Sequence, residues 1–276
     1  MFYNICIYLY NIAKEVLSLG KAIAIFNQKG GVGKTTTNIN LGACLASKGK
    51  KVLIIDIDPQ GNTTSGIGID KKNLDLSVYE VLINDTLHPS EAVLSTCINN
   101  LDILPSSVKL AGAEIELVEM EAREKRLKKV IDSIKLNYDY TFIDCPPSLG
   151  LLTINSLTAV DSVLIPIQCE FYALEGVSQL MSTVDLVKRN LNPNLEIQGV
   201  ILSMFDGRTN LAIQVVDEVK RYFKEKVYTT IIPRNIRLAE APSYGLPIVE
   251  YDPKSKGAEA YLDFADEFLE LEGENQ

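Results

Sequence analysis

Glycines and two lysines lie close together in residues 27–37, which read NQKGGVGKTTT. The G-K-T triplet at residues 33–35 fits the end of the phosphate-loop pattern G-x-x-x-x-G-K-[ST]. The opening glycine of that pattern is absent, because Gln28 occupies its position, and a second lysine, Lys29, follows directly. The stretch therefore predicts a phosphate site with one more cation than the pattern requires.

The residues of this loop have separate expected tasks in binding a nucleoside triphosphate such as ATP. Glycines let backbone N–H groups approach phosphate oxygens closely, and a helix that begins near Lys34 presents its positive end to the same anion. Lys34 is expected to neutralise the β and γ phosphates, Thr35 to bind Mg²⁺ through its hydroxyl, and Thr36 to reach the α phosphate. The expected phosphate-binding residues are Gly30, Gly31, Val32, Gly33, Lys34, Thr35 and Thr36.

Three aspartates follow two apolar runs of the chain. Asp56 and Asp58 lie in DIDPQGN, and Asp144 ends the run YTFID. A carboxylate that ends an apolar strand beside a phosphate loop usually holds the water shell of the metal, and we expect this of Asp144. Asp58 precedes a Pro-Gln-Gly turn, where it could orient the attacking water, with Asp56 as the alternative. Each aspartate taken singly could also be a turn or cap residue.

The segments that must position these residues alternate between strand-like and helix-like patterns from Lys21 onward. Apolar runs predict strands within 21–27, 50–58, 100–106, 138–147, 161–168, 195–205 and 227–233. Helical patterns cover 33–49, closed by Gly49, and 110–135. Ligands of such sheets bind at the carboxyl ends of the strands, where the loop and the aspartates lie. The sequence thus predicts an α/β fold: one P-loop NTPase domain with a mostly parallel central sheet flanked by helices.

Composition and charge leave several partners open. The 276 residues are 46% apolar, which supplies a sizeable core. The net charge is −9, but residues 257–276 hold seven acidic and no basic side chains, whereas residues 204–256 hold nine basic and seven acidic ones. A mildly basic interior stretch keeps binding to a polyanion open.

Cysteine and histidine give no sign of a metal centre. The five cysteines are scattered without C-x-x-C spacing, which suits reduced thiols in the cytoplasm. The single histidine, His88, lies in the polar stretch NDTLHPS and is interpreted as a loop residue.

Residues 1–18 are expected to be a non-native extension that results from a mis-assigned start, and residues 19–276 to be the ATPase domain. The apolar part of the extension is too short to span a bilayer and lacks the features of a signal peptide. Residues 14–16 can be encoded by a bacterial ribosome-binding sequence, and Leu19 by a TTG start codon. A membrane-surface helix is the alternative, although its polar face is thin.

These motifs resemble those of the ParA/Soj family of deviant Walker-A ATPases, which segregate bacterial chromosomes and plasmids. The similarity extends from Lys21 to about Phe264. It rests on NQKGGVGKTTT, DIDPQGNTTSGIG, LAGAEIEL, YDYTFIDCPPSLGLLTINSL, IPIQCEFYALEG, RTNLAIQVVDEV and IPRNIRLAEAPSYGLPI. These strings are long and specific to the family.

The resemblance implies roles for residues that the loop pattern alone leaves unexplained. Lys29 would reach across a nucleotide-sandwiched homodimer to the phosphates of the partner subunit, which makes it catalytic together with Lys34 and Asp58. Two ATP molecules that face each other concentrate negative charge, so a cation from each side is physically reasonable. Pro233 and Asn235 in IPRN would contact adenine.

The resemblance also implies a switch. ATP closes the dimer, the closed dimer binds double-stranded DNA without sequence preference, and hydrolysis stimulated by a ParB/Spo0J-type partner releases it. Arg208 and Arg237 match the DNA-contacting arginines of the family and fall in the mildly basic stretch. The lysines and arginine of 220–226 could widen that patch or form a solvated helix face. The expected location is the cytoplasm, on the nucleoid, and contact with the replication initiator is left open.

Other classes of ATPase share parts of these motifs. A MinD-like membrane ATPase needs a basic amphipathic C-terminal helix, which the acidic residues 257–276 do not provide, so no membrane partner is expected. An iron–sulfur ATPase needs cysteines that bridge a dimer, and Cys97 and Cys145 do not lie in such motifs. A small-molecule kinase or ligase needs an acceptor pocket, of which the sequence gives no sign. An orphan regulator of replication initiation remains an alternative cellular role.

Overall fold

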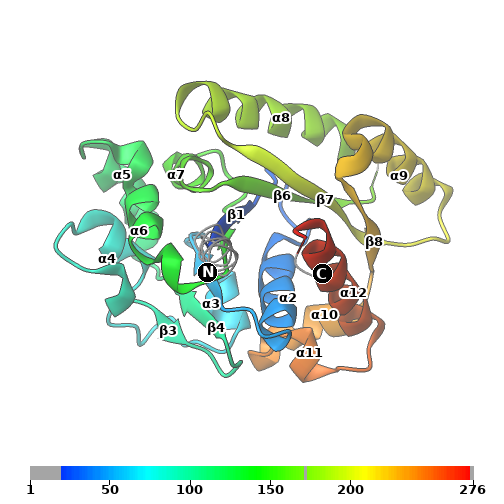
Figure 1. The fold of residues 1–276 in the computed structure, drawn as a ribbon, viewed down its shortest axis with the longest axis horizontal. Helices are drawn as coiled ribbons and strands as arrows, with labels where there is room; N and C mark the ends of the chain where they lie inside the picture. The colour runs from blue at the N-terminus through cyan, green and yellow to red at the C-terminus, as the bar shows by residue number, and fades with distance from the viewer. Residues whose placement is uncertain (1–19, 171–172, 274–276) are drawn as a thin grey trace, which may run out of the picture.

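The computed structural model describes residues 20–170 and 173–273, which form an eight-stranded sheet with helices on both faces (Figure 1). The strand order is β3-β4-β2-β5-β1-β6-β7-β8, and every described pair of neighbouring strands is parallel except the antiparallel pair β3 and β4. The strands are β1 (Lys21–Ile25), β2 (Val52–Asp56), β3 (Leu94–Ser95), β4 (Leu101–Leu104), β5 (Tyr140–Asp144), β6 (Ser162–Gln168), β7 (Glu196–Phe205) and β8 (Val227–Pro233). The predicted fold class is confirmed.

The helices connect these strands over both faces of the sheet. They are α2 (Lys34–Ser47), α3 (Asn62–Gly66), α4 (Val78–Ile83), α5 (Leu110–Val118), α6 (Arg126–Ile134), α7 (Leu151–Ala159), α8 (Ala173–Asn190), α9 (Asn210–Phe223), α10 (Ile236–Glu240), α11 (Ile248–Tyr251) and α12 (Lys256–Leu271). Short 3₁₀ turns cover Pro89–Glu91, Arg123–Lys125, Lys135–Asn137, Lys224–Lys226 and Ala241–Tyr244.

All seven predicted strands are present, but two local predictions differ from the structure. The helical pattern over 110–135 divides into α5 and α6, because the chain turns at Ala122, whose φ of 51° is incompatible with a continuing helix. The two-residue strand β3 was not predicted, because two residues are too few to show the alternation of apolar and polar side chains that indicates a strand. Gly49 ends the first long helix as expected, with a φ of 86° that favours glycine.

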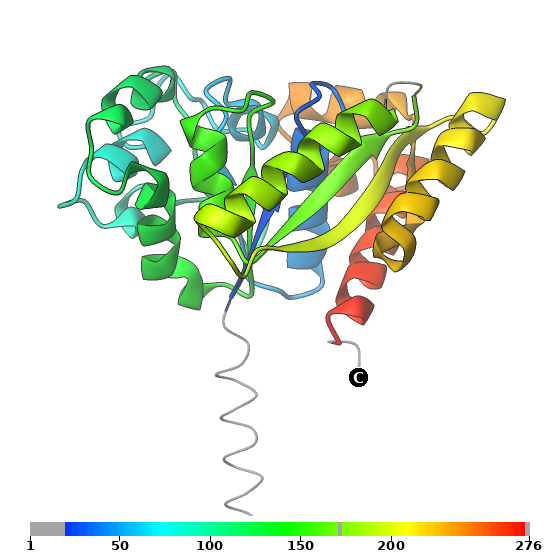
Figure 2. The ribbon, with the colours of Figure 1, turned by 90° about the horizontal axis from the view of Figure 1, so that it is seen from above.

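Alternate side chains of each strand enter two separate cores. Ile23 and Ile25 belong to the cluster that α2 and α12 cover, whereas Ala22, Ala24 and Phe26 belong to the cluster beneath α4 to α9. The two layers of helices are visible on opposite sides of the sheet in Figures 1 and 2. Burial on both faces explains why these strands are almost entirely apolar.

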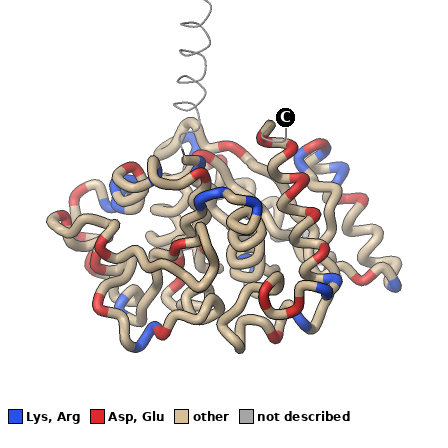
Figure 3. The backbone as a smooth tube through the Cα atoms, turned by 60° about the horizontal axis from the view of Figure 1, so that its bottom comes forward, with Lys and Arg blue, Asp and Glu red and all other residues tan. Residues whose placement is uncertain are grey.

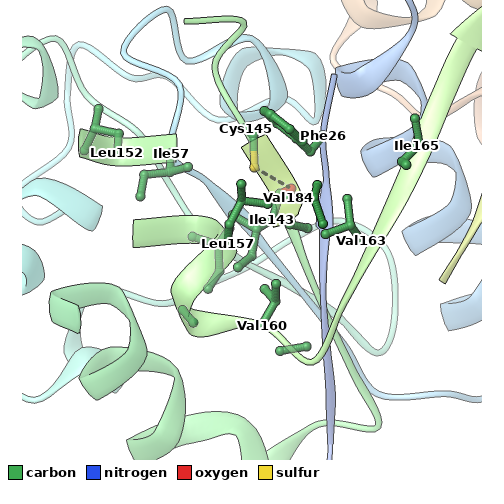
Figure 4. Close-up of a cluster of buried hydrophobic side chains, with 14 of the residues drawn as sticks. Phe26, Ile57, Ile143, Cys145, Leu152, Leu157, Val160, Val163, Ile165 and Val184 are labelled. Carbon is green, nitrogen blue, oxygen red and sulfur yellow. Dashed lines mark hydrogen bonds between the residues drawn. The ribbon is translucent and has the colours of Figure 1, made fainter. Parts of the chain in front are cut away.

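One of these cores reaches the carboxyl end of β5. Figure 4 shows Cys145 among Phe26, Leu157 and other apolar side chains, with its thiol directed to the carbonyl of Ile143 at 3.9 Å. Burial raises the pKa of the Cys145 thiol to about 12. The thiol is therefore a core group rather than a nucleophile or metal ligand.

The strand register brings the predicted site residues to one edge of the sheet. Asp144 at the end of β5 is level with Ile25 of β1 on one side and with Asp56 of β2 on the other. The loop after β1 and the aspartates after β2 and β5 thus leave the sheet side by side, as expected for parallel strands.

Some predictions concern residues beyond this description. The proposed extension at 1–18 lies outside the described residues, as does Cys6. Of the cysteines in the described part of the chain, Cys44, Cys97, Cys145 and Cys169 are free thiols, as expected. Within 20–170 and 173–273, no helix is long and apolar enough to cross a membrane.

Phe268→Ala should destabilise the fold strongly, because this fully buried ring joins α12 to the sheet. Its centroid lies 5.2 Å from that of Tyr140 and 6.0 Å from that of Phe142. Truncation of a buried aromatic side chain costs about 3–5 kcal/mol of unfolding free energy. Urea denaturation measures the change, with the exposed Leu271→Ala on the same helix as the control. Equal stability of the two variants would contradict this role of α12.

Candidate active site

The loop between β1 and α2 is fastened to the elements beside it. Asn27 Nδ2 donates a hydrogen bond to the carbonyl of Pro166 in β6 at 2.9 Å. Gln28, which replaces the opening glycine of the phosphate-loop pattern, donates to Thr183 Oγ1 of α8 at 2.8 Å. The departure from the pattern therefore has a structural use, since the glutamine ties the loop to a helix that covers the sheet.

The second half of the loop has a backbone that favours glycine. Gly31 and Gly33 have φ values of 74° and 92°, in the left-handed region that side chains rarely adopt. Gly33 is the N-cap residue of α2, and the carbonyl of Val32 accepts a hydrogen bond from Ser203 Oγ of β7 at 2.8 Å. The N-terminus of a 14-residue helix thus opens directly into the loop, which suits an anion.

Lys34 is a buried cation at this helix start. Lys34 is only 6% exposed. Its Nζ donates a hydrogen bond to the carbonyl of Lys29 at 3.1 Å, so the side chain of Lys34 spans the loop. Burial lowers the pKa of Lys34, while the nearby carboxylates of Asp144 and Asp58 act in the opposite direction. An ammonium buried in this way needs negative partners, which phosphate oxygens would supply.

Asp144 carries the clearest sign of a metal site. Thr35 Oγ1 and Thr63 Oγ1 each donate to its Oδ2 at 2.7 Å, while its buried Oδ1 has no hydrogen-bond partner among the described residues. Burial raises the pKa of Asp144, and the two threonine hydrogen bonds oppose that rise.

An unpaired carboxylate oxygen beside a threonine hydroxyl fits Mg²⁺, which takes oxygen ligands and usually binds proteins through one or two carboxylates. Within the described ranges, no group of three or more His, Cys, Asp or Glu side chains could hold a metal ion alone. The remaining ligands would have to be phosphate oxygens and water.

Asp56 and Asp58 differ in their hydrogen bonds. Asp56 is fully buried, and its oxygens accept from the backbone and hydroxyl of Thr64 at 2.8 and 2.7 Å and from the N–H of Asp58 at 3.2 Å. Burial raises the pKa of Asp56, and the neighbouring charge of Asp144 raises it further. Asp58 lies beyond the strand end, where its Oδ1 accepts from the N–H of Gln60 at 2.9 Å. Asp56 thus anchors the turn, which favours Asp58 for orienting water.

A pocket of about 210 Å³ lies next to the loop. Its walls come from the loop, α2, β7, β8 and α10, and they include Gly33, Thr36, Ser203, Ile232, Pro233 and Asn235. The two residues that the resemblance assigns to adenine therefore share a pocket with the phosphate loop. Asn235 Oδ1 accepts from the N–H of Arg237 at 2.8 Å and caps α10.

Lys29 lies at the margin of the site. Its side chain is 36% exposed, and Nζ lies 3.5 Å from Glu170 Oε2, just after β6. Glu170 Oε1 lies equally far, 3.5 Å, from a guanidinium nitrogen of Arg234, which lines the pocket. Lys34 spans the loop, whereas Lys29 presents its charge outside it.

Four residues of the site were not predicted: Thr63, Thr64, Glu170 and Arg234. The run GNTTSG after the Pro-Gln turn offered a signal for Thr63 and Thr64, because hydroxyls there can reach the strand-end carboxylates. Nothing in the local pattern around Glu170 indicates its contact with Lys29, 141 residues away.

Arg208 and Arg237 lie at the same edge of the sheet, because they follow the adjacent strands β7 and β8, whose ends pair at Phe205 and Pro233. The Arg208 side chain is 87% exposed and contacts Asp206 Oδ2 at 2.6 Å. Arg237 contacts Glu240 Oε2 at 2.9 Å and Asp252 Oδ2 at 3.4 Å. Both arginines are accessible, but neighbouring carboxylates neutralise them.

Two rival classes fit these observations poorly. The apolar face of α12, including Tyr261, Phe264 and Phe268, packs into the core, and its exposed turns are acidic, as the red positions near the label C in Figure 3 show. This helix has no apolar face left for a lipid surface. Cys145 is buried in the core while Cys97 is exposed after β3, so the two thiols do not form one metal site.

A parallel sheet of this order, with a glycine loop leading from a central strand into a helix, is the architecture of the P-loop nucleoside triphosphatases. A family model described as an AAA domain matches residues 20–197. The chain is 62% identical over 249 residues to the sporulation initiation inhibitor protein Soj of Bacillus subtilis, covering 90% of this chain and 98% of that protein. It is 53% identical over 257 residues to the chromosome partitioning protein ParA of Myxococcus xanthus, covering 91% and 89%.

Solved structures show the same fold. A cobyrinic acid a,c-diamide synthase from Mycobacterium smegmatis with bound ADP and magnesium matches with a TM-score of 0.81 and 38% identity, covering 93% of this chain and 97% of that one. The septum site-determining protein MinD of Pyrococcus horikoshii, complexed with Mg-ADP, matches with a TM-score of 0.77 and 29% identity, covering 92% and 98%. The chain belongs to the ParA/Soj family of chromosome-partitioning ATPases.

Lys34→Ala should abolish binding of ATP, because the loop loses its buried ammonium. One charge-assisted hydrogen bond contributes about 1.5–3 kcal/mol, and Lys34 would form more than one, so affinity should fall by more than about 100-fold. Titration with a fluorescent ATP analogue measures the loss. The exposed Lys254→Ala is the control for the change in net charge, and equal affinities of the two variants would contradict the role of Lys34.

Proposed function

We propose that this chain is an ATP-driven dimeric switch for chromosome or plasmid partitioning, which binds DNA without sequence preference while ATP is bound. The observation that carries the proposal is that the two lysines of one loop are placed differently. Lys34 is buried across the loop, and Lys29 lies outside it, paired with Glu170. A loop that served one subunit alone would have no need of the outer cation.

In this proposal, ATP takes one orientation in the site. Lys34 and the loop N–H groups bind the phosphates, and the pocket that includes Pro233 and Asn235 receives the adenine. Because Asn235 Oδ1 caps α10, its amide nitrogen is the atom available to the base. Thr35 and Asp144 would hold Mg²⁺, which would neutralise charge on the β and γ phosphates. The similar structures with bound Mg-ADP support this assignment.

Asp58 orients the attacking water in the proposed reaction. It is buried at the carboxyl edge of β2 and close enough to Lys34 to influence its pKa. Lys34 and Thr35 are committed to phosphate and metal, so neither is free to position water. Asp56 is committed to Thr64 and to the backbone of Asp58.

Lys29 completes the site of the second subunit. To do so it must leave Glu170, which costs little, since an ion pair this exposed contributes only about 0–1 kcal/mol. Two triphosphates facing each other provide a much larger opposing charge. In this proposal, dimer closure is therefore coupled to ATP through the side chain of Lys29, which lies outside the loop that Lys34 spans.

DNA binding is assigned to Arg208 and Arg237. DNA phosphates must displace Asp206 from the first arginine and Glu240 and Asp252 from the second, so a single subunit should bind weakly. Pairing two subunits doubles the contacts and raises the effective concentration of the second surface. ATP thereby controls DNA binding from a distance.

The cellular setting follows from the family alone. A ParB/Spo0J-type partner that stimulates hydrolysis and a location on the nucleoid are proposed by analogy with Soj and ParA. Contact with the replication initiator stays a prediction, and no residue is assigned to it.

Lys29→Gln should leave ATP binding by the monomer intact and prevent the closed dimer. The reason is that the Lys29 side chain lies outside the loop that Lys34 spans. Light scattering with and without ATP measures the mass, and a fluorescent ATP analogue confirms binding in the same samples. Lys254→Ala serves as the charge control. A Lys29→Gln protein that still dimerises with ATP would show that Lys29 is a solvated loop residue with no role in the closed dimer.

Arg208→Glu combined with Arg237→Glu should abolish DNA binding and spare ATP-dependent dimerisation. Since log K falls with log[salt] at a slope of about −0.9 per phosphate contact, the wild-type ATP form should show a steeper salt dependence than the ADP form. The loss in the variant should be similar on unrelated sequences, because phosphates carry no base information.

Filter binding across a salt series makes this measurement, with sizing of the same samples. Lys188→Glu combined with Arg189→Glu, at the end of α8 and the opposite edge of the sheet, is the control of equal charge change. If the double variant keeps its DNA affinity, Arg208 and Arg237 are not the contact surface, and the basic residues of 220–226 are the next candidates.

A further inference from the structure

Ser106 follows β4 and lies against the turn that carries Asp58. Its Oγ donates a hydrogen bond to the carbonyl oxygen of Asp58 at 2.7 Å, and its N–H donates to Thr64 Oγ1 at 2.9 Å. The residue is fully buried. Through these two bonds, Ser106 holds both the Asp58 turn and the segment that follows it.

The peptide groups on both sides of Asp58 are fixed. Its N–H donates to Asp56 Oδ1 at 3.2 Å, and its carbonyl accepts from Ser106 Oγ and from the N–H of Gly61 at 2.9 Å. One side-chain oxygen accepts from the N–H of Gln60 at 2.9 Å. Of these partners, Ser106 is the one that comes from another strand connection, 48 residues away.

We propose that Ser106 is a positioning residue for ATP hydrolysis, because its hydroxyl fixes the Asp58 turn and so the carboxylate that orients the attacking water. The inference rests on the proposed role of Asp58. A displacement of about 1 Å in a group that positions a reactant can cost about 10²-fold in rate. Among the described residues, Ser106 forms no hydrogen bond with the phosphate loop, so loss of its hydroxyl removes none of the hydrogen bonds of Lys34 and Thr35.

The adjacent serine provides a matched control. Ser107 is also buried, but its hydroxyl pairs with Ser77 Oγ at 2.9 Å, and Ser77 caps α4. Ser107 therefore fastens the same loop to a helix and not to the catalytic turn. Loss of either hydroxyl removes one buried hydrogen bond, but only the loss at Ser106 removes a hydrogen bond to the Asp58 turn.

The test compares Ser106→Ala, Ser107→Ala and Asp58→Ala with the wild type in steady-state ATP turnover. Ser106→Ala should lower kcat about tenfold and leave KM for ATP within about twofold, the signature of a group that acts on the chemical step. Ser107→Ala should retain wild-type kcat, and Asp58→Ala should stall. If Ser106→Ala does not fold, Ser106→Cys is used instead, because a thiol donates only weakly. This variant must also show a lowered kcat with KM for ATP nearly unchanged.

Each outcome separates the two claims. If Asp58→Ala stalls while Ser106→Ala matches Ser107→Ala, Ser106 is structural and the inference fails, although the role of Asp58 stands. A raised KM with unchanged kcat in Ser106→Ala would also overturn it. If Asp58→Ala turns over ATP at the wild-type rate, the proposed role of Asp58 fails, and the positioning role of Ser106 fails with it.

Discussion

The arrangement of the site depends on the burial of one carboxylate, Asp144, at the end of a central strand. A charge buried there must be compensated, and the compensation comes from two separate segments: Thr35 and the charge of Lys34 at the start of α2, and Thr63 in α3. Since Thr35 and Lys34 are joined to the phosphate loop, the carboxylate fixes where that loop enters its helix. The same constraint leaves Oδ1 without a hydrogen-bond partner among the described residues, so this oxygen is available to a cation.

The parts of the site that were predictable are those encoded locally. Two-sided burial produces apolar runs, a glycine loop has a fixed spacing, and Asp144 ends a strand whose register was implied by the parallel sheet. The break at Ala122 was not predictable, because the apolar positions of 110–135 keep helical spacing across it. Ser106 and Glu170 were missed because their contacts join segments far apart in the chain, which no local pattern records.

Fold alone does not determine function here. A diamide synthase and a MinD protein share the architecture with TM-scores of 0.81 and 0.77. The features of this chain that bear on its function lie at the margins of the sheet. The C-terminal helix that a membrane ATPase would turn to lipid has its apolar face in the core, as Phe268 shows, and acidic residues on its outer side. The arginines assigned to DNA lie at the edge where β7 and β8 end.

The ion pairs at that edge bear on how a protein with a net charge of −9 would bind DNA in the proposed switch. Arg208 and Arg237 are each held by carboxylates of the same subunit, so phosphate must compete with an internal anion at every contact. Such competition weakens every contact, but a set of contacts on one body shares one loss of translational freedom and therefore binds more tightly than a single contact. In the proposed switch, binding would thus depend steeply on the number of arginines presented on one body, and the proposed ATP-dependent pairing of subunits would change that number.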